Sequence, residues 1–434
     1  MTESVRENSS RGFSGESVVH DPVLVARTIP ARSVAQRIFS YVPGSIVKPN
    51  ALMRMFAVSA PGLETIVASE LHQMGNCDAA PVAGGVNFSG NLAQLYDANL
   101  NLRTASRIVV RVDEFHAGAF HELERRAKRI RWDEYLGPGS RAEFRVTCKK
   151  SKLYHSDAVA QRFSEAVAKQ VKGVVVGAAT KESAEEGDVE TDDSAPAQLF
   201  TVRLTHDNCV VSADSSGPLL HRRGYRQAIG KAPLRETLAA AMVIGSGWDG
   251  RSPFIDPMCG SGVIAIEAAL IARQIPPGIG RAFAFQNWPS YDETLWGSIK
   301  DKRLKLRHSA EIGAILASDR DDGVIKSAES NAARAGVTND IQFESKPISA
   351  IEPPKAPGWI VTNPPYGVRV GDRGALRNLY AQIGKVVRKK AKGYAVGLLT
   401  SDSMLESQLR LELEEVFRTR NGGIPVRFMK SATP

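Results

Sequence analysis

The sequence predicts an α/β fold, with a doubly wound parallel sheet in the second half and an α+β region before it. Residues 254–264 run from an apolar strand through an acidic tip and a Gly-x-Gly turn into a helix. Apolar runs at 312–318, 341–343 and 359–362 follow, with a helical pattern at 324–335, as expected of alternating strands and helices. In the first half, short strands alternate with amphipathic helices.

The charge of the chain is strongly basic. The chain has 434 residues, enough for two or three domains, and a formal net charge of +9. The segment 181–193 holds seven acids and one base, so the other residues are more basic by six charges than the chain as a whole. A basic body of this kind suits a polyanion partner.

The cysteines and the apolar runs exclude several classes of protein. No apolar run approaches the ~20 residues that a membrane span requires. The sequence contains no Cys-x-x-Cys pair and no histidine cluster, so it predicts no metal site. Isolated thiols favour a reducing compartment, and we expect a cytoplasmic protein. The thiols are Cys77, Cys148, Cys209 and Cys259.

Residues 1–53 are predicted to be a disordered N-terminal extension, because residues 1–21 are rich in Ser, Glu and Gly and have little to bury. Residues 24–48 are basic and free of glutamate and aspartate, as in an organelle presequence. Acids such as Glu3 and Glu16 precede them, however, and presequences contain few acids. A start codon placed too far upstream is the alternative.

The first ordered region is predicted to alternate strands and helices. Residues 119–135 are expected to form a basic helix. Its charged side chains can equally well form a solvated helix face or contact RNA. Strands are expected at 55–59, 86–89, 108–112 and 141–148, helices at 63–74, 92–100 and 157–172, a disordered acidic loop at 181–197, and a β-hairpin formed by 198–204 and 208–212.

Two basic and aromatic stretches are candidate RNA contacts. The first follows the strand at 141–148 and precedes a helix, whose N-terminal amides would favour phosphate. The second, at 221–226, is expected to connect the two halves of the chain. The candidate RNA-binding residues are Lys149, Lys150, Lys152, Tyr154 and His155 in the first stretch, and Arg222 and Arg223 in the second.

The glycine-rich turn at 256–262 is a candidate cofactor site. Its glycines allow backbone to approach a ligand closely, and Gly260 and Gly262 also fit a dinucleotide fingerprint. Two features oppose NAD. No acid stands at 273–279, where a ribose-binding acid is expected. Asp256 would repel a pyrophosphate, whereas it can pair with an ammonium group.

Two further strand ends complete this site. Asp319 ends the strand at 312–318, where its carboxylate can accept hydrogen bonds from both hydroxyls of a ribose. Asn363 follows the strand at 359–362 and can accept a hydrogen bond from a planar amine. A ligand with an ammonium group, a ribose and no phosphate is S-adenosylmethionine, and its methyl group would face that amine.

The residues after Asn363 are expected to form a stiff wall. Pro364 and Pro365 have fixed φ and carry no N–H, which leaves the Pro364 carbonyl free to accept a second hydrogen bond from the amine. Tyr366 is expected to stack on the ring that carries the amine.

Together these motifs resemble the THUMP-domain RNA methyltransferases, in particular the bacterial large-subunit (23S) rRNA guanine-N2 methyltransferases of the RlmL type. The similarity runs from about residue 54 to the C-terminus. It is carried most specifically by Asp256-Pro-Met-Cys-Gly-Ser-Gly262, Asn363-Pro-Pro-Tyr-Gly367, Ala232-Pro-Leu-Arg-Glu-Thr237, residues 149–157, residues 216–225 and residues 283–296.

The resemblance implies three domains after the extension: a ferredoxin-like lead-in at 54–110, a THUMP RNA-binding domain at 111–215, and an S-adenosylmethionine-dependent methyltransferase domain at 216–434. The last would be the Rossmann-like, seven-stranded sheet of class I methyltransferases. Its final antiparallel hairpin would be formed by 394–399 and 424–428.

The resemblance also assigns roles by position. The cofactor-binding set is Asp256, Pro257, Cys259, Gly260, Gly262, Asp319 and Asn363, and the catalytic set that positions the base is Asn363, Pro364, Pro365 and Tyr366. One departure stands at 345–347, where Ser-Lys-Pro replaces the acid with which many relatives contact the adenine amine. We therefore expect backbone amides to make that contact.

Several alternatives remain open at this point. A tRNA guanine-N2 methyltransferase would share both domains. A non-catalytic RNA-binding or ribosome assembly factor is opposed by the complete set of Asp256, Gly260, Asp319 and Asn363, and an NAD oxidoreductase is opposed by Asp256. RNA is the expected partner, with no membrane and no obligate protein partner.

Overall fold

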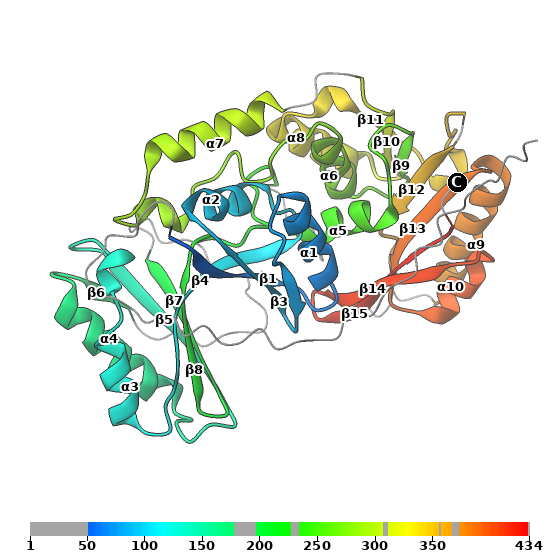
Figure 1. Cartoon of the computed structure of the whole chain (residues 1–434). Helices are drawn as coiled ribbons and strands as arrows, with labels where there is room; N and C mark the ends of the chain where they lie inside the picture. The colour runs from blue at the N-terminus through cyan, green and yellow to red at the C-terminus, as the bar shows by residue number, and fades with distance from the viewer. Residues whose placement is uncertain are drawn as a thin grey trace, which may run out of the picture. The chain divides into compact units, whose positions relative to one another are not determined.

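The computed structural model describes residues 51–177, 197–226, 234–306, 311–355, 357–366 and 373–432. The predicted extension and the predicted acidic loop lie almost entirely outside these ranges. Within them the chain forms two sheets, each flanked by helices (Figure 1). The first strand already begins at Met53, so the extension predicted to end at residue 53 is one residue too long.

The first sheet has eight described strands in the order β2-β3-β1-β4-β8-β7-β5-β6. Neighbouring strands are antiparallel, except that β5 runs parallel to both β6 and β7. The strands are β1 (Met53–Ser59), β2 (Ala80–Val82), β3 (Gly85–Gly90), β4 (Ala105–His116), β5 (Arg141–Lys149), β6 (Val175–Val176), β7 (Gln198–Thr205) and β8 (Asn208–Asp214).

The helices of this region cover one face of the sheet, because the strands alternate apolar and polar residues. In β1, Met55 and Ala57 are buried in the same core as residues of α1 and α2, whereas Arg54 is exposed. In β7, Phe200 and Val202 pack into that core with residues of α4. The helices are α1 (Glu64–Gln73), α2 (Leu92–Asn101), α3 (Phe120–Ala127) and α4 (Ser156–Gln170).

The predicted lead-in and the predicted THUMP domain share one continuous sheet. Residues 105–110 of β4 pair with β1, and residues 109–116 of the same strand pair with β8. The boundary predicted at residue 110 therefore falls inside a strand. The division into two modules stays a prediction from the sequence.

The second sheet has the order β11-β10-β9-β12-β13-β15-β14 among the described residues. The strands from β11 to β13 are parallel, and β15 is antiparallel to both β13 and β14. The strands are β9 (Phe254–Asp256), β10 (Ile315–Asp319), β11 (Ile341–Ser345), β12 (Gly358–Thr362), β13 (Tyr394–Thr400), β14 (Glu414–Asn421) and β15 (Ile424–Lys430).

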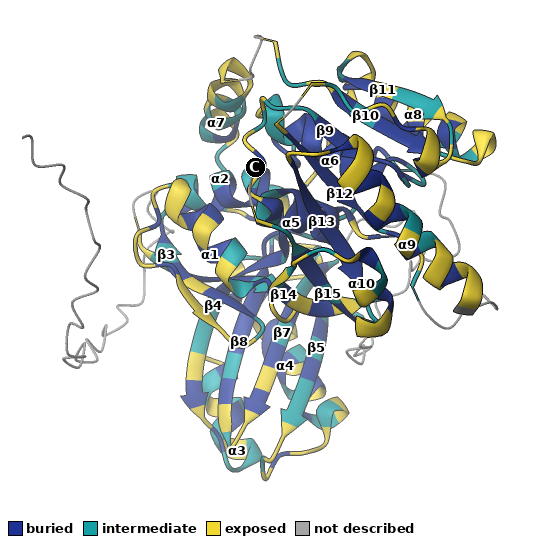
Figure 2. Ribbon diagram, turned by 90° about the vertical axis from the view of Figure 1, so that its right-hand side faces the viewer, coloured by how far each residue is buried: buried dark blue, intermediate teal, exposed yellow. Residues whose placement is uncertain are grey.

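Helices pack against both faces of this sheet, which confirms the predicted doubly wound α/β class. Phe254 and Val361 pack with α5, α6 and α8, whereas their neighbours Ile255 and Ile360 pack with α9 and α10. Strands β12 and β13 are buried along their whole length (Figure 2). The helices are α5 (Glu236–Ser246), α6 (Val263–Ala272), α8 (Asp322–Ala335), α9 (Arg373–Lys390) and α10 (Ser403–Leu409).

Two predicted elements differ from the structure. The segments predicted as the final hairpin are antiparallel neighbours, β13 and β15, but the hairpin itself is formed by β14 and β15. On its other side β13 runs parallel to β12. The helix predicted at 119–135 ends at Ala127, and a single 3₁₀ turn, η1 (Trp132–Glu134), follows. Trp132 closes this end, because its indole Nε1 donates to the carbonyl of Ala127 at 3.0 Å.

The segment after α6 packs against the first sheet rather than the second. It contains a 3₁₀ turn, η2 (Ala284–Asn287), and helix α7 (Glu293–Lys305), which the sequence did not predict. Phe285 stacks on Tyr96 of α2 with ring centroids 4.3 Å apart. Trp288 Nε1 donates to Gln198 Oε1 at 2.7 Å, and Arg303 Nε donates to Asp97 Oδ1 at 2.7 Å.

No helix in the described ranges combines the length and the apolar character needed to cross a membrane. In the same ranges, His, Cys, Asp and Glu side chains form no group of three or more that could hold a metal ion.

Candidate functional site

Three polar side chains lie at the carboxyl ends of adjacent parallel strands. Asp256 ends β9, Asp319 ends β10 and Asn363 follows β12, and β9 lies between the other two strands and pairs with both. In doubly wound sheets, ligands bind at this edge. The structure therefore brings together the three residues that the sequence assigned to the ammonium group, the ribose and the substrate amine.

Asp256 is fully buried, and within the described ranges only one of its carboxylate oxygens has hydrogen-bond partners. Oδ1 accepts hydrogen bonds from Thr362 Oγ1 at 2.9 Å and from Met258 N at 3.4 Å. Oδ2 has no hydrogen-bond partner among the described residues. Burial raises the pKa of Asp256 to about 7, although both hydrogen bonds lower it. A buried carboxylate oxygen without a partner indicates a place for a cationic or donating group of a ligand.

The glycine turn needs its glycines for two different reasons. Gly260 and Gly262 have φ of 53° and 81°, in the left-handed region that disfavours other residues. A Cβ on Gly262 would lie 2.9 Å from the Cβ of Ala328 in α8, so the close packing of that helix requires glycine. A Cβ on Gly260 would meet no atom within 4 Å, so that position borders open space.

The turn also holds Asp319 in place. Gly260 N donates to Asp319 Oδ2 at 3.2 Å, and Asp321 N donates to Oδ1 at 3.2 Å. Asn331 of α8, a residue that the sequence did not single out, donates from Nδ2 to the carbonyl of Ser261 at 3.0 Å. Mid-helix asparagines give no sequence signal for such a contact, because it joins residues 70 positions apart.

Two other predicted cofactor residues lie in the interior. Pro257 and Cys259 are both buried. The backbone N–H of Cys259 donates to the carbonyl of Ser318 at 2.9 Å, which ties the turn to β10. Burial raises the pKa of the Cys259 thiol. This position therefore supports the shape of the turn and keeps a protonated thiol.

The predicted catalytic residues line the end of β12. The side-chain Oδ1 of Asn363 is buried and has no hydrogen-bond partner among the described residues. Pro364 is buried and Pro365 is exposed. The hydroxyl of Tyr366 accepts a hydrogen bond from Asn421 Nδ2 at 2.9 Å, so β14 anchors the aromatic residue. Sequence reasoning missed Asn421 because it missed β14. Gly367 lies outside the described residues.

Residues Ser345–Pro347 lie at the expected adenine side of the site, where many relatives have an acidic residue instead. Lys346 pairs through its ammonium group with Glu344 of the same strand end. Its backbone N–H donates to the carbonyl of Asp319 at 2.8 Å. The lysine therefore does not bring an uncompensated charge to this edge, and a backbone contact to adenine stays a prediction.

The first predicted RNA stretch forms one exposed loop between β5 and α4. Lys149, Lys150, Lys152, Tyr154 and His155 are all exposed, and the rings of Tyr154 and His155 lie 4.1 Å apart. The β7–β8 turn holds the loop, because Lys152 N donates to Asp207 Oδ1 at 2.7 Å and Asp207 N donates to Ser151 Oγ at 3.0 Å. The five side chains are thus gathered on a fixed backbone.

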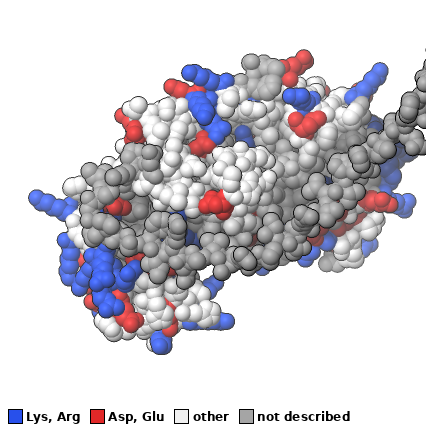
Figure 3. Space-filling view, in the orientation of Figure 1, with Lys and Arg blue, Asp and Glu red and all other residues white. Residues whose placement is uncertain are grey.

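The basic charges of α3 and the turn after it divide into two groups. Arg126 donates to Asp113 at 2.8 Å and Arg131 to Asp133 at 2.8 Å, so these two are engaged within the protein. Arg125, Lys128 and Arg129 are exposed. Lys and Arg side chains gather at the lower left of Figure 3, where Figure 1 places α3 and α4.

The structure contradicts the RNA contact predicted for Arg223. Its side chain is 2% exposed and donates to Glu267 Oε2 at 2.8 Å and to the carbonyl of Arg103 at 2.6 Å. A phosphate could reach it only if these interior hydrogen bonds were broken. Arg223 is therefore a structural residue, and the basic connector pattern reflects an internal ion pair. Arg222 is half-buried beside it.

Comparisons with known proteins place the chain in a family. The model of the RMKL-like methyltransferase domain matches residues 223–430, and that of the RlmL ferredoxin-like domain matches residues 54–109. A protein of Synechocystis sp., provisionally named an RNA methyltransferase, is 35% identical over 376 residues, which are 86% of this chain and 95% of that protein.

Solved structures agree with this. A provisionally named methyltransferase complexed with SAH is 29% identical, with a TM-score of 0.77 over 88% of this chain and 98% of that one. A protein of Listeria monocytogenes, described from its sequence as an N6-adenine-specific DNA methylase, is 30% identical, with a TM-score of 0.76 over 88% and 97%. The resemblance to RlmL-type proteins is confirmed: the chain belongs to the RMKL-like methyltransferases that carry an RlmL-type ferredoxin-like domain.

Proposed function

We propose that the chain transfers the methyl group of S-adenosylmethionine to the exocyclic N2 amine of a guanine in RNA, with large-subunit (23S) rRNA as the substrate. The proposal is carried by two buried oxygens at adjacent strand ends, Asp256 Oδ2 and Asn363 Oδ1, which have no hydrogen-bond partner within the described part of the chain. The provisional name of the Synechocystis relative supports RNA as the substrate class. The choice of guanine N2 and of rRNA rests on the resemblance to RlmL-type enzymes.

The residues present fit this cofactor. Asp256 Oδ2 is available to accept a hydrogen bond from the ammonium group, and the open space beside Gly260 leaves room for the methionine part. Asp319 would accept hydrogen bonds from the ribose hydroxyls. The SAH bound by the related solved structure supports the same assignment. When bound, the cofactor supplies a methyl group on a sulfonium, which is already electrophilic.

The protein then has to hold and align the substrate. Asn363 Oδ1 and the Pro364 carbonyl accept hydrogen bonds from the guanine amine and point its nitrogen toward the methyl group, because displacement needs an in-line approach. The same two oxygens favour the positive charge that develops on that nitrogen. The proton leaves to water afterwards. The guanine must be unpaired or flipped out of a helix to reach this edge.

The first region of the chain would bind the RNA substrate. The loop with Lys149, Lys150 and Lys152 binds RNA phosphates next to the ring pair of Tyr154 and His155. Residues 54–110 act as lead-in and 111–215 as THUMP domain. The four cysteines are free in the structure, which supports a reducing compartment such as the cytoplasm.

The test is the identity of the methylated nucleoside. Purified chain is incubated with labelled S-adenosylmethionine and with rRNA or tRNA from a strain that lacks it, and the nucleosides are analysed by mass spectrometry. We expect N2-methylguanosine in rRNA. The same nucleoside in tRNA would move the substrate to tRNA, and N6-methyladenosine would overturn the guanine assignment. No product on any RNA would favour a non-catalytic binding factor.

The role of Asn363 is tested in parallel. Asn363→Ala is expected to abolish methyl transfer, because the amine loses its acceptor, while calorimetry still shows cofactor binding through Asp256 and Asp319. Asn101→Ala is the matched control, since this asparagine donates to Asp97 in the other sheet's helix α2, far along the chain from the site. Loss of cofactor binding in Asn363→Ala would show that the residue serves the cofactor instead.

A further inference from the structure

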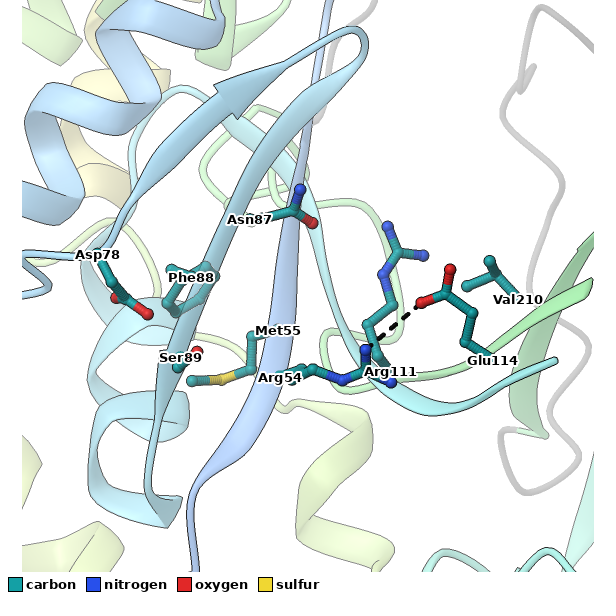
Figure 4. A pocket seen from close by; sticks show the side chains of 9 residues that line it. All are labelled: Arg54, Met55, Asp78, Asn87, Phe88, Ser89, Arg111, Glu114 and Val210. Atoms are coloured by element: carbon teal, nitrogen blue, oxygen red, sulfur yellow. Dashed lines mark hydrogen bonds and ion pairs between the residues drawn. The ribbon is translucent and has the colours of Figure 1, made fainter. Parts of the chain in front are cut away.

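The face of the first sheet that lies opposite its helices carries a pocket of about 390 Å³ (Figure 4). Nine residues line it, among them the exposed carboxylate of Asp78 and the core residues Met55 and Phe88. The other six come from four strands: Arg54 of β1, Asn87 and Ser89 of β3, Arg111 and Glu114 of β4, and Val210 of β8. None of these residues belongs to the predicted cofactor, catalytic or RNA-binding sets.

The strand register explains why these side chains meet. Arg54 lies opposite Ser89, and Phe56 lies opposite both Asn87 and Val109 on its two neighbouring strands. Arg111 lies opposite Ser212, and Glu114 lies opposite Val210. Residues two apart on a strand share a face. The register shift between Arg111 and Asp113 brings Glu114, three residues on, to the face of Arg111, so these positions form one strip across the sheet. Figure 4 shows Arg54, Arg111 and Glu114 converging on the same side of β1.

Arg111 forms a flat platform in this strip. Its guanidinium carbon lies 4.4 Å from the centroid of the Phe56 ring, and its Nη1 donates to Ser212 Oγ at 3.1 Å. The guanidinium thus lies over the ring, and the hydrogen bond ties one of its nitrogens to β8. A fixed guanidinium plane is a surface on which an unpaired nucleobase stacks.

Arg54 supplies a cation beside that platform. Its side chain is 62% exposed, and its Nη1 lies 3.4 Å from Glu114 Oε2, while Glu114 Oε1 accepts a hydrogen bond from Asn208 at 3.0 Å. An exposed ion pair of this kind contributes little stability, so a phosphate can replace Glu114 as the partner of Arg54 at little cost. The exposed amide of Asn87 lines the same pocket and can both donate to and accept from a base edge.

We propose that this pocket binds one unpaired nucleotide of the RNA substrate, with its base stacked on Arg111 and its phosphate on Arg54. The inference rests on the proposed function. It extends it, because it places a second RNA contact on the same sheet whose strand β5 ends in the loop with Lys149. The RNA would then be held at two points of the first sheet while the target base enters the second.

The two ends of the Arg54–Glu114 pair give a test with opposite signs. Arg54→Gln is expected to weaken binding of a labelled, mixed-sequence, single-stranded RNA about threefold, and to lower the slope of log affinity against log salt by about one. Glu114→Gln is expected to tighten binding about twofold, because Arg54 no longer has a competing carboxylate. If the pair only stabilised the sheet, the two variants would change affinity in the same direction or not at all, and that result would overturn the proposal.

The stacking platform is tested with the charge kept constant. Arg111→Lys retains the cation but loses the planar group, so we expect at least fivefold weaker RNA binding with an unchanged salt slope. Arg418→Gln is the control, because Arg418 is 65% exposed and pairs with Glu415 as Arg54 pairs with Glu114. It should leave RNA binding unchanged. Circular dichroism shows that each variant is folded.

Failure of this inference differs from failure of the proposed function. If the unaltered chain neither binds nor methylates RNA, the proposed function itself is wrong. If the unaltered chain binds and methylates RNA, but Arg54→Gln, Glu114→Gln and Arg111→Lys all behave as it does, then only the pocket assignment is wrong.

Discussion

At the scale of single residues, Thr362 joins the two halves of the candidate site. It precedes Asn363 in the chain, and its hydroxyl fixes one oxygen of Asp256 so that the other is left for a ligand. The sequence could predict Asp256, Asp319 and Asn363, because each is a polar residue at the end of an apolar run. It could not predict Thr362, Asn331 or Asn421 as partners, because their hydrogen bonds join residues 106, 70 and 55 positions apart.

Cofactor binding is expected to depend on pH through Asp256. Burial raises the pKa of Asp256 to about 7, so the carboxylate is protonated below that value and carries its negative charge above it. Affinity for S-adenosylmethionine should therefore rise as pH rises from about 6 to about 7.5, below the range in which an α-ammonium group loses its own proton. Calorimetry over this range checks it. Asp256→Asn should bind weakly at every pH, and a pH-dependent Asp256→Asn would assign the titration to another group.

Thr362→Val tests the orienting hydrogen bond. Loss of a hydrogen bond to a carboxylate costs about 1.5–3 kcal/mol, so cofactor affinity should fall about tenfold or more. Because that hydrogen bond lowers the pKa of Asp256, the midpoint of the pH dependence should also move upward. Thr362→Ser should restore both. A variant that is merely less stable, with an unmoved midpoint, would show that Thr362 serves packing alone.

At the scale of elements, hydrophobic periodicity predicted the strands and helices of the core, but it did not predict the polar elements at the sheet edge. The sequences of strands β9, β10 and β12 are short apolar runs, because helices cover these strands on both faces. The sequence of strand β14 is rich in charged residues, because β14 is an edge strand in which only Phe417 and Thr419 are buried. The Gly422–Gly423 turn, with both residues at positive φ, was the signal that could have found the hairpin.

The glycine turn gives a prediction about an element. Gly262→Ala is expected to lower stability by about 2–4 kcal/mol, because it adds left-handed strain to a Cβ overlap with Ala328 in α8. Gly336→Ala is the matched control: this glycine ends α8 at a φ of 72°, and its Cβ would meet nothing within 4 Å. It should cost about 1 kcal/mol, from the strain alone. Denaturant unfolding of both variants compares them, and equal losses would mean that the overlap relaxes freely.

At the scale of the molecule, the chain crosses repeatedly between the two sheets. Residues 283–303 follow α6 of the second core yet pack on α2 and β7 of the first. Arg103, which follows α2, donates to the carbonyl of Ile275 at 2.7 Å. Local periodicity carries no information about such pairings, so the sequence did not predict that residues 283–303 pack on the first sheet.

The Arg223–Glu267 pair is the buried centre of this connection. Glu267 of α6 is fully buried, accepts a hydrogen bond from Arg223 at 2.8 Å, and accepts another from the Tyr225 hydroxyl at 2.9 Å. Arg223 in turn donates to the carbonyl of Arg103. The connector at 221–226 is thereby tied both to the first helix after the cofactor turn and to Arg103, which follows α2.

Breaking this ion pair should therefore lower the stability of the whole molecule. Glu267→Gln is expected to lower the free energy of unfolding by about 3–5 kcal/mol, because it leaves the Arg223 guanidinium buried without a counter-charge. Glu415→Gln, which breaks the solvent-accessible pairs with Arg418 and Arg427, should leave the stability nearly unchanged. Thermal unfolding followed by two probes, one in each sheet, distinguishes the consequences. Coincident transitions at a lower Tm would show that the pair stabilises both sheets as one cooperative unit, whereas a change confined to one sheet would show that the connection between them does not depend on it.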